Sequence, residues 1–238
     1  MRDAFFTTQW TRVIAAKGGT EDARIALGEL SESYYAPVVS FLRREGRSED
    51  DARELAHSFF AWLLSRDALS TVERDRSRFR SYLLGALKHF INHQREKSSA
   101  QKRGSQFIHL RIQAATDTSP GLDPPDPLGL PPDQEFDRQW ALHLIREALT
   151  KTEAEWIKAG KAQEFISLRP FLDGNASHGE LTTLAERTGQ NENTLRSQLH
   201  RLRRAFRKQL KSQISPTVPS KNEVSDELQT LVDSLKVS

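Results

Sequence analysis

Residues 181–211 constrain the fold most, because they combine the signals of a tight turn with an apolar helical stripe. The apolar side chains of the second half recur at spacings of three and four, the period of an amphipathic α-helix. They are Leu195, Leu199, Leu202, Phe206 and Leu210. Ahead of them, Ala185 is small enough for close helix approach, Gly189 can take a positive φ, and Asn191 is a good N-cap. The pattern predicts two helices joined by a tight turn.

The face opposite this stripe is polar and strongly basic. No acid occurs at residues 193–222, whereas seven arginines and lysines fall between positions 196 and 211. They are Arg196, Arg201, Arg203, Arg204, Arg207, Lys208 and Lys211. Such a helix suits the DNA major groove, because cations neutralise phosphates while polar side chains near its N-terminus reach base edges. The alternative is a solvated basic surface helix packed on a core.

Composition narrows the class of protein. The chain has 238 residues, a formal net charge of +3 and no cysteine, which excludes disulfides, thiolate-zinc sites and a cysteine nucleophile. The first ten residues are too charged for a signal peptide, and no apolar run approaches the roughly 18 residues of a membrane span. We expect a soluble cytoplasmic protein without membrane insertion.

Residues 116–134 divide the chain, because they carry six prolines among four aspartates and so predict an extended, solvated tether. No segment alternates convincingly at period two, so an all-α fold of two helical domains is expected. The expected domains are residues 1–115 and 135–214, joined by a flexible linker at 116–134 and followed by a C-terminal amphipathic extension at 215–238.

Periodicity and capping signals place the individual helices. We expect helices at residues 21–44 (bent near Pro37), 48–65, 78–97, 136–150, 153–159, 162–168 and 223–235. Gly46 should end the first of these, and Ser48 should cap the next.

The C-terminal extension combines an apolar stripe with acids. The stripe comprises Val224, Leu228, Leu231 and Leu235, and the acids are Glu223, Asp226, Glu227 and Asp233. The stripe predicts that this helix docks on the protein itself, because leaving it wet is costly. Its acids are then expected to cover the basic helix of residues 192–211, unless the extension merely completes a core.

A second basic region interleaves cations with aromatic residues. Arg78, Phe79, Arg80 and Tyr82 lie together, a composition that suits single-stranded DNA because rings stack on unpaired bases. The alternative is that the two aromatic residues belong to the core and the arginines to an ordinary surface.

Three blocks of the chain resemble the extracytoplasmic-function sigma factors of bacterial RNA polymerase. They are DDARELAHSFFAWLL, RFRSYLLGALKHFINHQREK and LAERTGQNENTLRSQLHRLRRAFRKQL. The first two are similar to sigma region two and the third to region four. The prolonged linker and C-terminal extension resemble a branch of that family.

The resemblance implies three groups of functional residues. The surface that binds polymerase comprises Asp51, Arg53, Glu54, His57 and Ser58. The minus-ten and strand-opening residues are Arg78, Phe79, Arg80, Tyr82, Lys88, His89, Asn92, His93 and Arg95. The upstream-element reader comprises Glu192, Asn193, Thr194, Arg196, Ser197, His200, Arg201 and Arg204.

The implied partners are core RNA polymerase and promoter DNA, and no cofactor, metal or catalytic residue is expected. An anti-sigma factor, a regulatory kinase and the C-terminal tail are alternative controllers. The rival function is a dimeric helix-turn-helix regulator that acts without binding the polymerase core.

An enzyme is the third class considered. His89 and His93 stand at i and i+4, a spacing that zinc sites use, but no Glu follows His89 and no third ligand is evident. The chain also lacks a phosphate-binding glycine loop and a GxSxG nucleophile motif. The sequence therefore predicts a binding protein.

Overall fold

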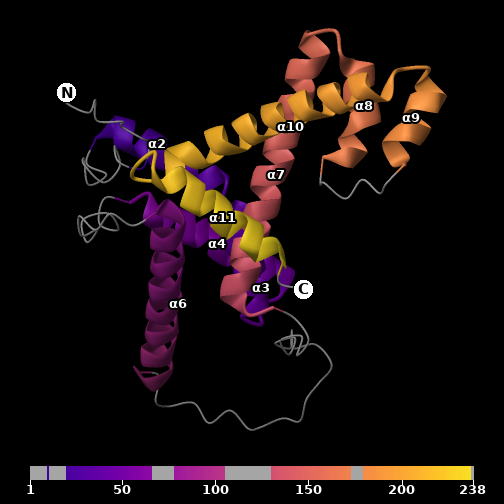
Figure 1. The fold of residues 1–238 in the computed structure, drawn as a ribbon. Helices are drawn as coiled ribbons and strands as arrows, with labels where there is room; N and C mark the ends of the chain where they lie inside the picture. Colours follow the sequence, from indigo (N-terminus) through magenta and orange to yellow (C-terminus); the bar gives the residue numbers. More distant parts are fainter. Residues whose placement is uncertain (1–9, 11–19, 66–77, 105–129, 173–178, 237–238) are drawn as a thin grey trace, which may run out of the picture. The chain divides into compact units, whose positions relative to one another are not determined.

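The computed structural model describes residues 10, 20–65, 78–104, 130–172 and 179–236, and within these ranges every regular element is helical (Figure 1). This confirms the expected all-α fold. The chain forms two compact units, Met1–Ala141 with Pro216–Ser238 (unit 1) and Leu142–Ser215 (unit 2). Within the described ranges, no helix has the length and apolar character that a bilayer crossing requires.

From residue 20 onward, unit 1 contains α2 (Glu21–Glu32), α3 (Tyr35–Arg44) and α4 (Glu49–Leu63). The predicted bend near Pro37 is instead a break between α2 and α3, closed by a hydrogen bond from the Tyr34 N–H to the Ser31 carbonyl (2.9 Å). Pro37 therefore stands in the first turn of α3, where its missing N–H costs no helical hydrogen bond.

The start of α4 follows the sequence signals. Gly46 takes a φ of 84°, and the Ser48 hydroxyl accepts a hydrogen bond from the Asp51 N–H at 3.2 Å, so both predictions are confirmed. One face of α4 is buried through Ala52, Ala56, Phe59 and Leu63.

The helices α6 (Phe79–Gly104) and α7 (Pro132–Lys158) are long. α7 replaces the two helices predicted at 136–150 and 153–159, because Thr152 is accommodated inside it by donating its hydroxyl to the Ala148 carbonyl at 2.7 Å. α7 also begins at Pro132, a residue type favoured at the first helical position, and it passes from unit 1 into unit 2. α7 thus begins inside the linker predicted at 116–134, and the two units divide at 141/142 rather than at 134/135. Residues 116–129 lie outside the described residues.

The core of unit 1 is aromatic. Phe79 is fully buried, with its ring centroid 5.0 Å from that of Trp10 and 5.1 Å from that of Tyr34, while Phe136 stacks on Tyr34 at 6.2 Å. These rings bring the start of α6 against α7.

The C-terminal extension belongs to unit 1. After η2 (Ser215–Thr217), α11 (Glu223–Lys236) follows, and Figure 1 draws it in yellow. Thr217, Val218, Glu227 and Leu231 are buried. The buried side chains of the extension thus help to complete unit 1, which agrees with the alternative that the tail completes a core.

Unit 2 contains the rest of α7, then α8 (Ala162–Leu168), η1 (Arg169–Phe171), α9 (Glu180–Thr188) and α10 (Glu192–Ile214). The range of α8 agrees with its prediction. One apolar cluster joins these helices; its buried residues are Trp156, Phe165, Leu168, Leu184, Ala185, Leu195, Leu199 and Leu202. Figure 1 shows α8 and α9 beside the N-terminal part of α10.

Candidate nucleic-acid interface

The turn between α9 and α10 has the geometry of a helix-turn-helix. α9 ends at Thr188 and is capped by Gly189, whose φ of 65° is left-handed and whose N–H donates to the Ala185 carbonyl. An L side chain at this φ is strained, which explains the glycine. The Asn191 side chain then accepts a hydrogen bond from the Asn193 N–H at 2.8 Å and caps α10.

Packing fixes the two helices on each other. Ala185 is buried beside Leu195 and Leu199, the contact for which its small size was predicted. The Thr182 hydroxyl also donates to the Glu192 carboxylate at 2.9 Å, which ties α9 to the first turn of α10. α10 is therefore held at its N-terminal end, where a groove-binding helix contacts bases.

The predicted upstream-element reader lies on the solvent side of α10. Seven of its eight side chains are exposed: Asn193, Thr194, Arg196, Ser197, His200, Arg201 and Arg204. Glu192 is half-buried, and its carboxylate forms an ion pair with the Arg196 guanidinium at 2.5 Å. The Ser197 hydroxyl donates to the Asn193 carbonyl at 2.9 Å. The reader is thus one continuous polar surface.

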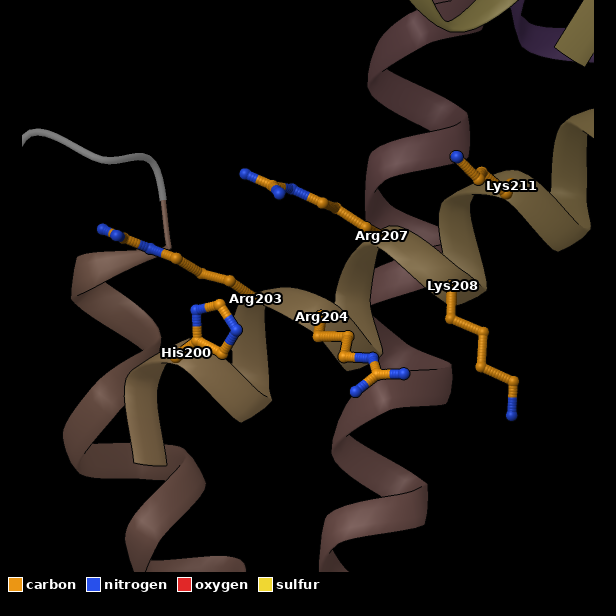
Figure 2. Close-up of a pocket in the computed structure, with 6 residues that line it drawn as sticks. All are labelled: His200, Arg203, Arg204, Arg207, Lys208 and Lys211. Atoms are coloured by element: carbon orange, nitrogen blue, oxygen red, sulfur yellow. The ribbon is translucent and has the colours of Figure 1, made fainter. Parts of the chain in front are cut away.

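The basic surface continues beyond the predicted reader. A recess of about 540 Å³ along α10 is lined by His200, Arg203, Arg204, Arg207, Lys208 and Lys211. Figure 2 shows that these six side chains all project from this one helix. The Arg203 guanidinium already has a partner within the protein, because it donates a hydrogen bond to the Phe171 carbonyl at 2.7 Å. The other cations project into solvent. The predicted reader stopped at Arg204, although the acid-free run of sequence already extended past Lys211.

The predicted minus-ten side chains form an exposed row on α6: Lys88, His89, Asn92, His93 and Arg95. Two of the cations have acidic partners, Lys88 with Asp133 at 2.6 Å and Arg95 with Glu45 at 2.8 Å. A recess of about 300 Å³ is lined by the four residues of these ion pairs and by Phe41, Ile91, Asn92 and Pro132. Both ion pairs are exposed, so their release costs little.

The strand-opening block is not the exposed surface that the sequence predicted. Phe79 is fully buried, Arg80 is buried, and Arg78 and Tyr82 are half-buried. Burial raises the pKa of the Tyr82 hydroxyl to about 12. The alternative of core aromatic residues is correct here, because the rings of Trp10 and Tyr34 surround Phe79.

The two arginines of this block converge on an acid of α11. Glu227 is fully buried and accepts hydrogen bonds from Arg78 at 2.6 Å and from Arg80 at 2.9 Å. Arg80 also donates to Asp137 and lies 5.1 Å from the Trp140 ring centroid. Burial disfavours the charged guanidinium, but Glu227 and Asp137 outweigh it and raise the pKa of Arg80.

The acids of the extension are therefore placed differently from their prediction. Glu223, Asp226 and Glu227 lie within 4.0 Å of Arg78, and Asp233 pairs with Lys236 at 3.0 Å. Sequence reasoning missed the roles of Glu227 and Asp137. No local signal joins Glu227 to Arg80, which is 147 positions away.

The predicted polymerase-binding residues share the exposed face of α4: Asp51, Arg53, Glu54, His57 and Ser58. The Tyr35 hydroxyl lies 3.0 Å from a ring nitrogen of His57, and the two rings are stacked. Trp62, half-buried on the same helix, stacks on His89 of α6. Within the described residues, no three acidic or histidine side chains gather as metal ligands.

Comparisons with protein-family models, with curated proteins and with solved structures find no match to this chain.

Proposed function

We propose that this protein is a sigma factor that binds core RNA polymerase in the cytoplasm. It recognises two promoter elements and separates the DNA strands for transcription initiation. The observation that carries the proposal is α10, a capped helix with polar side chains at its N-terminus and a basic face behind them. This combination suits base readout with phosphate neutralisation.

Two further features support the proposal. The exposed face of α4 offers charged and aromatic groups that its own core does not need, and α6 carries a second basic row. A chain with these surfaces in two units can contact two DNA segments while the polymerase sets their spacing. An upstream reader alone would bind DNA without opening it. Catalysis of transcription then belongs to the polymerase, and this chain is not an enzyme.

Run-off transcription with purified bacterial core polymerase tests the function. Duplexes that bind the complex of core enzyme and this protein are first selected from a random pool. The selected duplexes then serve as templates. We expect transcripts only when both proteins are present, from templates with two asymmetric elements. Selection of symmetric sites by the protein alone, with no transcript on addition of core enzyme, would instead establish the dimeric regulator.

A further inference from the structure

We propose that Arg78 and Arg80 form a binding site for a phosphodiester of unpaired DNA, and that Glu227 of α11 occupies this site as an internal competitor. The two guanidinium groups approach different oxygens of the one carboxylate, at 2.6 and 2.9 Å. A phosphodiester offers the same arrangement of two anionic oxygens, and arginine pairs readily with either group.

The site is preorganised on the side away from α11. Arg80 is held by Asp137 and by the face of Trp140, both on α7, so its position does not depend on Glu227 alone. Arg78 depends more on α11, because besides Glu227 it contacts Glu223, Asp226 and Thr230 of the same helix. Three carboxylates of α11 thus surround Arg78, and their removal would leave it unpaired among the described contacts.

The attachment of α11 is limited enough to be reversible. Among the residues of α11, only Glu227 and Leu231 are buried, while Val232 is exposed to 39%. The ion pairs of Glu227 contribute less than their Coulomb attraction, because both partners lose hydration. A phosphodiester that replaces the carboxylate restores the charge balance of the arginines, so exchange costs mainly the apolar contacts of buried Leu231 and of half-buried Val224, Leu228 and Leu235.

The choice of DNA as the ligand rests on the proposed function, together with the basic row that continues along α6 from Lys88 to Arg95. Competition by α11 would keep the free protein from binding unpaired strands indiscriminately. The site would then open where DNA is presented at high local concentration.

Fluorescence anisotropy with a labelled single-stranded oligonucleotide of mixed sequence tests the competition on the full chain. E227Q keeps the shape of the side chain and removes its charge, so it should bind the oligonucleotide about fivefold or more tightly than the parent protein. D233N is the matched control, because it removes one charge from the same helix away from the two arginines. The double variant R78Q/E227Q should return to the parent affinity.

Several results would overturn the proposal. The first is an E227Q protein of normal helical content that binds the oligonucleotide no more tightly than the parent. The second is an equal increase in affinity in D233N, and the third is an increase that persists in R78Q/E227Q. Titration of E227Q with inorganic phosphate separates the two sources of phosphate. Tight phosphate binding without any gain for the oligonucleotide would exclude DNA as the ligand.

Hydrogen exchange in the unmodified protein covers the case in which E227Q fails to fold. Addition of the oligonucleotide should accelerate amide exchange in α11 while leaving α9 unchanged. Unchanged exchange in α11 up to millimolar oligonucleotide would refute the competition. Neither assay contains polymerase, so failure of the run-off experiment would refute the sigma function and leave these results standing.

Discussion

Arg196 stands one turn into α10, and its side chain is 62% exposed while it pairs with Glu192. An exposed pair of this kind contributes little, so the guanidinium can leave Glu192 for a base edge at small cost. Lys208 lies three turns further along the same helix, in the basic recess, and is exposed as well. The two residues should therefore act on DNA in different ways.

Replacement of Arg196 by Ala should cost about 1–3 kcal/mol of binding free energy and relax the preference at one base pair. Lys208→Ala is the matched control and should weaken binding to all sequences while lowering the salt dependence. Competition binding over single-base variants of the selected site, at two salt concentrations, measures both effects. Identical losses on every sequence from both variants would mean that α10 reads no bases.

Helix α4 has one buried face and one exposed polar face. Its buried face is apolar, whereas Glu54 lies on the exposed face. Charge reversal there changes no buried contact. Glu54→Lys should therefore leave helical content intact and weaken retention of the protein by core polymerase roughly tenfold, as loss of a complementary interface charge does.

Co-purification with tagged core enzyme measures this retention, and circular dichroism checks the fold. Glu29→Lys, an exposed acid on α2, provides the comparison at equal net charge. Undiminished retention of Glu54→Lys, or an equal loss in Glu29→Lys, would remove this face of α4 from the contact.

For the whole molecule, the position of the C-terminal extension decides how stability is distributed. Deletion of residues 216–238 removes Val218 and Leu231 from the core of unit 1 and takes Glu227 away from its two arginines. Loss of one partner of a buried ion pair typically costs about 3–5 kcal/mol. The truncated protein should unfold at a lower denaturant concentration.

Hydrogen exchange resolves where this loss falls. We expect faster exchange in the first two turns of α6 and of α7, which belong to unit 1, and unchanged exchange in α9 and α10, which belong to unit 2. A truncated protein of unaltered stability would show that the buried positions of α11 contribute nothing to unit 1.

Local signals determined much of this fold. Ser48, Gly189 and Asn191 each act within a few residues of their own position, so the start of α4 and the helix-turn-helix were predictable from sequence. The exposure of the reader on α10 followed for the same reason, because a period of 3.6 residues assigns each side chain to a face once one stripe is buried. The break before Pro37 and the unbroken course of α7 depended on packing that outweighs local propensity.

Only the tertiary structure decided the state of the strand-opening block. The pattern around Phe79 fits an exposed stacking surface as well as a core, and the rings of Trp10 and Tyr34 select the core. Likewise, acids on an amphipathic tail can meet any basic surface, and nothing in their spacing distinguishes the arginines of α6 from those of α10. The pairing of Glu227 with Arg80 arises from chain segments 147 positions apart, and burial of both charges is favourable only when folding brings them together.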